Sequence, residues 1–515
     1  MYRILISLLL VIIIAGCSND NGDGGNENGE STLNIGYNAQ PNSIDPHISN
    51  TATTTDVSRH IFEQLLAFNE NNEVAPLLAE SYDISEDGKN ITFHLRKDIK
   101  FHNGKVMTAD DVVASMERWR GLNGKAIAYL SNSEFVKEDE NTVILRMDKP
   151  LTIVQYILAM SSNFGAIMPK EIIEAADTAT GVKEYIGTGP FKFVEWKQDQ
   201  HIKLSKNEDY KSPSGEASGL VGKREPLVDN IYFHIVKDAS TRAAGIQTGE
   251  YDLSTQILTD NIEQLKNDPN LELHLQPASF LTSVFNKSKG LFADQRAREA
   301  VNLAVNKEEV MIAAYTSDEY YALEHGLMSE SYPVWHNDGG KDKYNAYDPE
   351  AAKKLLKEAG YNGETIRIIA TRDYEDHYQA AVVLQQKLEE IGMKVDLEVY
   401  DWPTLLEKRT DENAYDIYMM VFLTPTDPTQ IQYLDSRYKF PGWTNDPEID
   451  KLIDEMIVAP TPEEAKEIFT KIQEKNWEYL PAVKYGDIKR PQITSKEISG
   501  FKFFQGPVLW NVTKE

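Results

Sequence analysis

The sequence predicts an α/β protein with at least two lobes. Three observations predict this class: alternating strand patterns dominate the first half, residues 366–399 form a β-α-β pattern, and residues 498–512 are again rich in strand-forming and aromatic residues. At roughly 150 residues per domain, the 515 residues correspond to three or four folding units. We find no internal repeat with a period of about 20–50 residues, so a repeat array is excluded.

The first half opens with a strand and a hairpin. Residues 33–37 alternate apolar and polar side chains, which predicts a strand. Residues 82–101 predict a hairpin that turns at Asp87-Gly88, a dipeptide that favours tight turns. Thr108, with Asp111 three residues later, predicts the capped start of a helix.

The second half changes to alternating helices and strands. Asp348-Pro349 predicts a helix start and Gly360 its end. A strand at 366–370, a helix at 375–391 and a strand at 395–399 form a β-α-β unit, which implies parallel pairing with a right-handed crossover. Two further helices are predicted to start at Asp446-Pro447 and Thr461-Pro462.

The N-terminus predicts export and anchoring. A short basic start is followed by an apolar run from Ile4 to Ala15, which is typical of a signal peptide and short for a membrane span. The sequence Ile14-Ala-Gly-Cys17 resembles the lipobox of bacterial lipoproteins, which implies a signal peptide at 1–16 and lipid attachment at Cys17; an ordinary signal or a short anchor is the alternative. The Asn/Asp/Gly/Glu-rich segment up to residue 32 predicts a flexible tether at 17–32. We therefore expect an extracytoplasmic protein held on the cell membrane.

Composition excludes several functions. The chain has 53 Lys and Arg against 81 Asp and Glu, a formal charge of −28, and such a surface repels nucleic acid. Cys17 is the one cysteine, so an intramolecular disulfide and a CxxC motif are both excluded.

Motifs for catalysis and cofactors are also absent from the sequence. It contains no GxSxG, GxxxxGK[ST] or HExxH motif, and Gly187-Thr-Gly-Pro190 lacks the third glycine of a dinucleotide loop. His94 and His102 are eight residues apart, which suits no compact metal site, and we expect two solvated polar tips. The sequence therefore assigns no catalytic residue, no metal ligand and no cofactor.

Four ordered stretches resemble the family-5 extracellular solute-binding proteins, the oligopeptide- and dipeptide-binding subunits of ABC importers. The stretches are Leu78-Ala-Glu-Ser-Tyr82 through Phe101-His-Asn-Gly104 to Thr108-Ala-Asp-Asp-Val112, Gly187-Thr-Gly-Pro-Phe-Lys-Phe193 with Asn207-Glu-Asp-Tyr210, Phe292-Ala-Asp-Gln-Arg-Ala-Arg298 leading into Ala300-Val-Asn-Leu-Ala304, and Tyr347-Asp-Pro-Glu-Ala351 with Asn445-Asp-Pro-Glu-Ile-Asp450. Each stretch alone is weak, and their order and spacing make the resemblance specific over nearly the whole mature chain.

The resemblance implies a two-lobed periplasmic-binding-protein-like fold of class II, with an extra subdomain inserted in lobe I. Lobe I is expected at 33–278 plus 491–515, the insert at about 46–180, and lobe II at 279–490. The crossings near Pro277 and Pro491 would form the hinge. The implied function is capture of a small solute, an oligopeptide in the leading interpretation, and its delivery to an ABC permease by a monomeric receptor without enzymatic activity.

Three loops are predicted to contact the ligand. Tyr37, Asn38 and Gln40 leave the first strand, and loops after strands carry ligand contacts in α/β clefts; a plain turn is the alternative. Trp402 stands where similar proteins place a cleft-facing aromatic residue, although a core tryptophan fits the pattern equally well.

The third loop departs from the family pattern. In peptide-binding relatives it carries an aromatic residue, an aspartate that pairs with the ligand's α-amino group, and a later Asp-Pro. Here Phe422 takes the aromatic place and Asp427-Pro428 is kept, but Thr424 or Pro425 replaces the amine-binding aspartate. A buried ammonium without a charged partner is costly. Either Asp427 substitutes, or the ligand has no free α-amine.

Other functions remain open at this stage. Acidic pairs such as Glu138-Asp139 and Glu389-Glu390 could serve an extracytoplasmic hydrolase, although 81 acidic residues make such pairs unavoidable. A sensory or adhesive lipoprotein is a third class. Within the binding class, a nickel chelate or a sugar is an alternative ligand.

Overall fold

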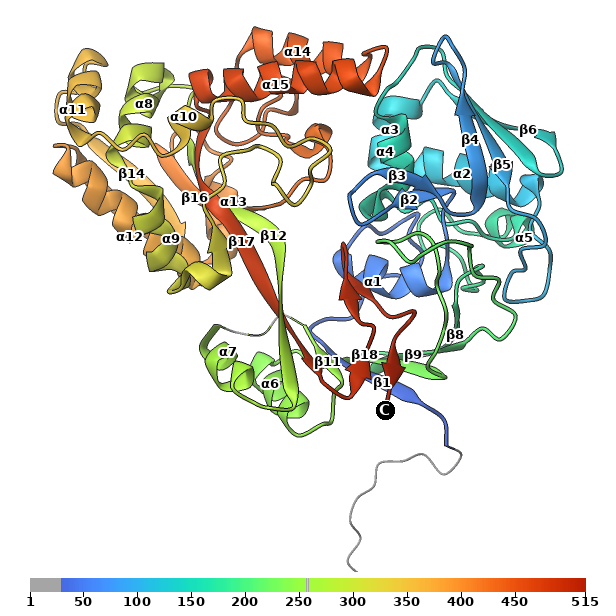
Figure 1. The fold of residues 1–515 in the computed structure, drawn as a ribbon. Coiled ribbons are helices and arrows are strands. Elements are labelled where there is room, and N and C mark those ends of the chain that lie inside the picture. The colour runs from blue at the N-terminus through green and yellow to red at the C-terminus, as the bar shows by residue number, and fades with distance from the viewer. Residues whose placement is uncertain (1–28, 256, 258) are drawn as a thin grey trace, which may run out of the picture.

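The computed structural model describes residues 29–255, 257 and 259–515, and it has the predicted two-lobed α/β architecture (Figure 1). The predicted signal peptide, Cys17 and all but the last residues of the tether lie outside the described residues. Within the described part of the chain, no helix combines the length and apolar character needed to cross a membrane.

One large mixed sheet runs through both lobes. Its path in the described residues is β15-β14-β16-β12-β17-β11-β1-β10-β9-β8, and β13 pairs with β17. Its strands are β1 (Thr32–Tyr37), β8 (Phe191–Lys197), β9 (His201–Lys206), β10 (Asn230–Ile235), β11 (Leu253–Ser254), β12 (Leu271–Phe285), β13 (Tyr321–Ala322), β14 (Thr365–Thr371), β15 (Lys394–Tyr400), β16 (Ile417–Leu423) and β17 (Ala482–Ser495).

The long strands β12 and β17 connect the lobes, and they run side by side in Figure 1. Their lower halves pair with each other next to β11, whereas the upper half of β12 lies between β16 and β17. The register shifts between Pro277 and Ser279, and Leu275 pairs with Pro491 close to this shift. Proline has no N–H to donate to a ladder. The paired strands are thus interrupted at the level where the chain passes from one lobe to the other.

A second sheet lies in the upper part of lobe I. It has the order β4-β5-β7-β6 and consists of β4 (Ala79–Ile84), β5 (Asn90–Leu95), β6 (Glu134–Asp139) and β7 (Thr142–Arg146). The predicted hairpin is confirmed, with Ile84 opposite Ile91. The predicted helix start is also confirmed, because the Asp111 carboxylate accepts the Thr108 N–H at 3.0 Å.

Helices cover both lobes. They are α1 (Ala52–Ile61), α2 (Ala109–Leu122), α3 (Gly124–Leu130), α4 (Val154–Ala159), α5 (Lys170–Glu174), α6 (Ala239–Gln247), α7 (Thr259–Lys266), α8 (Gln295–Ala304), α9 (Lys307–Tyr315), α10 (Lys341–Tyr344), α11 (Pro349–Glu358), α12 (Glu375–Glu390), α13 (Trp402–Lys408), α14 (Pro447–Ile457) and α15 (Pro462–Tyr479). The β-α-β unit is confirmed, since β14 and β15 flank α12 and pair in parallel. Asp446 and Thr461 cap α14 and α15 as predicted.

The strand-rich tail is present as four two-residue strands, β18 (Ile498–Ser499), β19 (Lys502–Phe503), β20 (Pro507–Val508) and β21 (Thr513–Lys514). Residues with positive φ separate them, among them Gly500 and Gly506. One local prediction is wrong. His102 is not a solvated tip: its Nε2 lies 3.0 Å from the Gly189 carbonyl oxygen, and burial lowers the pKa of its ring to about 4.

Candidate ligand-binding cavity between the lobes

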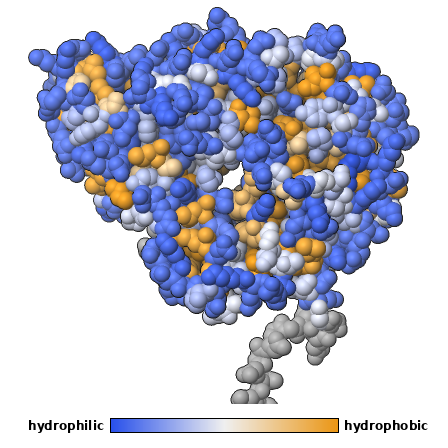
Figure 2. All heavy atoms as spheres, in the orientation of Figure 1, coloured by the Kyte–Doolittle hydropathy of each residue, from blue (hydrophilic) through white to orange (hydrophobic). Residues whose placement is uncertain are grey.

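A cavity of about 1190 Å³ lies between the two lobes. On one side it is lined by the end of β1, by α1 and α3, and by the C-terminal tail. On the other side it is lined by the end of β16 and the segment that follows it, while β12 and β17 contribute at the crossing. Figure 2 shows an opening between the lobes on this face. A space of this size, walled by two bodies, accommodates a small solute.

Tyr37 and Asn38 line the lobe I wall, as predicted for a loop after a strand. The Tyr37 hydroxyl donates a short hydrogen bond to Asp56 of α1. Burial raises the pKa of the Asp56 carboxyl to about 6, even though Arg59 and the Tyr37 hydroxyl act in the opposite direction. The same burial, together with Asp56, raises the pKa of Tyr37 well above its usual value. These groups therefore form a buried polar base beneath the cavity.

The buried Arg59 ties this base to the C-terminal tail. Its guanidinium donates to the carbonyl oxygen of Phe504 at 3.0 Å and to that of Gln505. Gly506 follows with φ +128, and a Cβ there would lie 2.2 Å from Asp56 Oδ1. The tail can approach this closely because residue 506 has no side chain.

The lobe II wall is aromatic. Phe422, at the end of β16, stacks on Tyr433 with ring centroids 5.5 Å apart and planes at 21°. Phe280 and Phe440 pack against Phe422 at 5.7 and 5.8 Å. Thr424 also lines the cavity, and its N–H donates to the Ala278 carbonyl oxygen at 3.1 Å. The third predicted loop therefore brings Phe422 and Thr424 to the wall.

Asp427 does not line the cavity. Its side chain is 1% exposed. Oδ1 accepts the Thr429 N–H at 2.8 Å and the Thr429 hydroxyl, and Oδ2 lies 3.3 Å from Nζ of Lys125. Its acceptors are thus used inside the protein, and we withdraw the expectation that it replaces the amine-binding aspartate.

Gln40 and Trp402 also lie outside the lining. Gln40 Oε1 accepts the Asp199 N–H at 2.9 Å. Trp402 is half-buried against Tyr374 and His377, with centroids 4.9 and 5.7 Å away. Because the Val421 N–H donates to Nε2 of His377, Trp402 supports the cavity wall from behind.

The lobes are closed on each other. The Thr152 N–H donates to the Ile457 carbonyl oxygen at 3.1 Å. Trp335 of lobe II packs on Tyr156 of the insert with centroids 5.4 Å apart, and both belong to one apolar cluster that spans the cleft. The ion pair of Lys125 with Asp427 crosses the same gap.

Four charged side chains line the cavity, and three of them have a charged partner. Asp56 pairs with Arg59 at 3.7 Å, Glu70 with Lys502 at 3.9 Å, and Lys125 with Asp427. Arg490 of β17 is exposed, and no carboxylate of the described residues lies within 4 Å of it. The cavity thus presents one unpaired cation.

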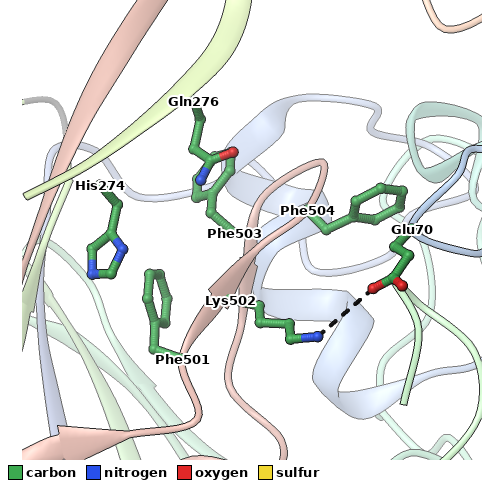
Figure 3. Close-up of a pocket in the computed structure, with 8 residues that line it drawn as sticks. Glu70, His274, Gln276, Phe501, Lys502, Phe503 and Phe504 are labelled. Carbon is green, nitrogen blue, oxygen red and sulfur yellow. Dashed lines mark ion pairs between the residues drawn. The ribbon is translucent and has the colours of Figure 1, made fainter. Parts of the chain in front are cut away.

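A smaller cavity of about 260 Å³ adjoins the large one (Figure 3). It lies between His274 and Gln276 of β12 and the tail residues Phe501, Phe503 and Phe504. Gln276, Phe503 and Phe504 line both cavities, so the tail forms the partition between them.

Sequence reasoning missed Lys125, Arg490 and the tail loop. The tail carried a usable signal, since its aromatic residues are clustered, and Arg490 directly precedes the predicted hinge residue Pro491. Lys125 carried none, because its partners Asp427 and Thr429 lie 302 and 304 residues further along the chain.

The family model that describes bacterial extracellular solute-binding proteins, family 5 Middle, matches residues 73–444 of this sequence. The chain belongs to this family. It is 29% identical over 490 residues to the probable peptide ABC transporter periplasmic-binding protein y4tO of Sinorhizobium fredii, with 90% of each chain covered. It is 30% identical over 415 residues to the dipeptide-binding protein of Escherichia coli, with 74% of each covered.

A solved structure shows the same fold. The binding protein AgaA of A. tumefaciens R10, in complex with agropinic acid, is 26% identical and superposes with a TM-score of 0.71, covering 94% of this chain and 99% of AgaA. These relatives are binding proteins, and y4tO is named as one of an ABC transporter; the family is one of solute-binding proteins, not enzymes, which agrees with the sequence interpretation and argues against a hydrolase.

Proposed function

We propose that this chain is the substrate-binding subunit of an ABC importer, and that it captures an oligopeptide-like solute between its lobes. The observation that carries the proposal is the closed cavity with walls from both lobes. A ligand shifts an open–closed equilibrium only through its preference for the closed state. Contacts with both walls supply that preference.

The cavity favours a ligand with an anionic group. Arg490 is its unpaired cation among the described side chains. Thr424 offers no charge at the position of the amine-binding aspartate, and Asp427 is held by Lys125 and Thr429. We therefore propose that the ligand binds through a carboxylate and aromatic contacts rather than through a free α-amine. The names of the relatives fit both a peptide and another organic acid.

We assign lobe I to 33–278 plus 491–515, the insert to about 46–180, and lobe II to 279–490. Closure would bend β12 and β17 near Pro277 and Pro491, where the ladder is interrupted. Bending at this level costs few hydrogen bonds. A lipid on Cys17 would keep the monomeric receptor next to its permease and raise its local concentration there.

A thermal-shift screen of peptides, organic acids, sugars and metal chelates tests the function. A cognate ligand at 100 times its dissociation constant stabilises the native state by about 2.7 kcal/mol. We expect one class with a carboxylate to do so, and mass spectrometry to recover it unchanged. Absence of stabilisation by every class, or cleavage of the ligand, contradicts the proposal.

Arg490→Gln tests the carboxylate contact, and Lys489→Gln is its matched control on the same strand. Successive strand residues face opposite sides, and Lys489 does not line the cavity. We expect the first variant to weaken binding at least about tenfold, and the second to leave it unchanged. Equal affinities of both variants would show that Arg490 is not the anchor.

The lipid anchor has its own test. Cys17→Ala should abolish labelling with a radioactive fatty acid and release the protein from the membrane fraction. Retention of the label on the variant would place the anchor elsewhere.

A further inference from the structure

Three metal-ligating side chains gather in the irregular loop between β13 and α10. Glu324, His325 and His336 each offer a ligand atom, and these atoms lie within 4.8 Å of one another. Glu324 Oε1 is 3.2 Å from Nδ1 of His325 and 4.0 Å from Nδ1 of His336. The side chains are 7%, 6% and 18% exposed, respectively. This cluster lies outside the ligand cavity.

Backbone carbonyl groups orient both rings. The carbonyl oxygen of Asn337 lies 3.1 Å from Nε2 of His325, and that of Met328 lies 3.0 Å from Nδ1 of His336. A ring that donates one N–H to a carbonyl keeps its other nitrogen unprotonated, as in metal-bound histidines. The nitrogens left for a metal ion are therefore Nδ1 of His325, which faces Glu324, and Nε2 of His336.

Gly326 leaves the space that the cluster occupies. A Cβ at this position would lie 3.1 Å from Glu324 Oε1 and 3.1 Å from His336 Nδ1, and 2.5 Å from the Met328 carbonyl oxygen. Any other residue would therefore crowd Glu324, His336 and the Met328 carbonyl group.

The local charge suits a cation. The Glu324 carboxylate is held in place by the Gly326 N–H, which donates to its Oε1 at 2.7 Å. Lys484 is a cation that would repel a metal ion at this site, but its charge is already paired with Asp487 at 2.7 Å. Asp338 adds a carboxylate 3.6 Å from Nε2 of His325.

We propose that Glu324, His325 and His336 bind one divalent transition-metal ion of the zinc type. Two imidazole nitrogens and one carboxylate oxygen are a donor set that zinc accepts, with a fourth position left for water.

Such an ion would clamp the base of a loop that reaches the ligand cavity. Ser331 and Tyr332 of the loop line the cavity, and Trp335 packs on Tyr156 across the cleft. Joining the two ends of the loop, at His325 and His336, removes conformations of this wall that do not fit the ligand. The metal would thus act as a structural element of the receptor.

Zinc titration of the tag-free protein, in competition with a chromogenic chelator, tests the proposal. We expect one Zn²⁺ per chain at this site, and His325→Ala and His336→Gln to weaken it at least about tenfold. His94→Gln is the matched control, since His94 forms a single exposed pair with Asp83 at 3.1 Å, and it should leave zinc binding unchanged. Circular dichroism verifies that the variants fold.

X-ray absorption at the zinc edge of the wild-type protein makes the test independent of the variants. Two imidazole nitrogens and an oxygen at about 2.0–2.2 Å are expected. An oxygen-only shell, no zinc binding, or binding that both histidine variants retain would overturn the proposal. Slower amide exchange of residues 326–335 in the zinc-loaded protein is the expected sign of the clamp, and unchanged exchange would refute that part.

Discussion

The ion pair between Lys125 and Asp427 is expected to hold the lobes closed. Lys125 lies on α3 of lobe I, and Asp427 precedes the short helix η4 (Pro428–Gln430) of lobe II. Lys125 Nζ is 3.3 Å from Asp427 Oδ2 and donates to the Thr429 hydroxyl at 2.7 Å. Opening the cleft breaks both contacts. Lys125→Met removes them and keeps the apolar stem of the side chain.

The effect of Lys125→Met on closure can be estimated from the kind of contact that is lost. A hydrogen bond to a charged group contributes about 1.5–3 kcal/mol, and the side chains are 21% and 1% exposed, so solvent screens the pair only partly. Since 1.4 kcal/mol corresponds to a factor of ten, closure becomes about 10- to 100-fold less favourable in Lys125→Met. The dissociation constant of the ligand rises by the same factor when the open state dominates without ligand.

Calorimetry with the ligand from the thermal-shift screen measures this factor. Lys353→Met is the control. Lys353 also pairs with a carboxylate, that of Glu350 at 2.7 Å, but both residues lie in α11, so this pair does not cross the cleft. A double-mutant cycle with Asp427→Asn isolates the pair from the helix cap that Asp427 also provides. The reasoning is refuted if Lys125→Met binds the ligand as tightly as Lys353→Met does.

Three further predictions concern stability. The carboxyl of Asp56 has a pKa of about 6 in the folded protein and 3.8 in the unfolded chain, so between these values the folded protein keeps a proton that the unfolded chain has lost. The free energy of unfolding, relative to that of Asp56→Asn, should therefore fall by on the order of 3 kcal/mol as the pH rises from 4 to 6. Urea titrations measure it, and a difference that stays constant with pH would refute this. Gly506→Ala should lower the melting temperature and weaken ligand binding, because the positive φ and the contact with Asp56 both disfavour a side chain; an unchanged melt speaks against a rigid tail. Trp335 is 2% exposed and packs on Tyr156 with the ring planes tilted by 57°. Trp335→Ala should therefore cost about 3–5 kcal/mol in the free energy of unfolding, and a loss below about 1 kcal/mol would mean that the cleft repacks.

Local signals predicted the regular elements well. The caps at Thr108 and Asp348, the hairpin turn at Asp87-Gly88 and the β-α-β period depend on residues close in the chain, and the structure contains all of them. Composition predicted strands in the tail but not their length, because positive-φ positions such as Gly506 limit each of them to two residues.

The candidate site was predictable only where it follows strand ends. Tyr37 and Phe422 end β1 and β16, and strand ends mark ligand sites in α/β folds. Asp427 was misplaced for two reasons. It caps the short helix η4 through the Thr429 N–H, a role that Asp-Pro also indicates at Asp446-Pro447. Its other partner, Lys125, is distant in the chain and has no sequence signature. His325 and His336 are eleven residues apart, and the segment between them is neither helix nor strand, so no periodicity in the sequence predicts that they meet.

The two kinds of contact across the cleft have different consequences for specificity. The packing of Trp335 on Tyr156 and the pair of Lys125 with Asp427 form whenever the lobes close, whatever lies between them. They therefore stabilise the closed state by the same free energy for every ligand, and removing them should weaken all ligands by one common factor. Contacts from Arg490 and Thr424 depend on what the ligand presents, so changing them should alter the order of affinities. If loss of Trp335 reordered the ligands while loss of Arg490 scaled them uniformly, the assignment of closure to the first set and of selection to the second would be reversed.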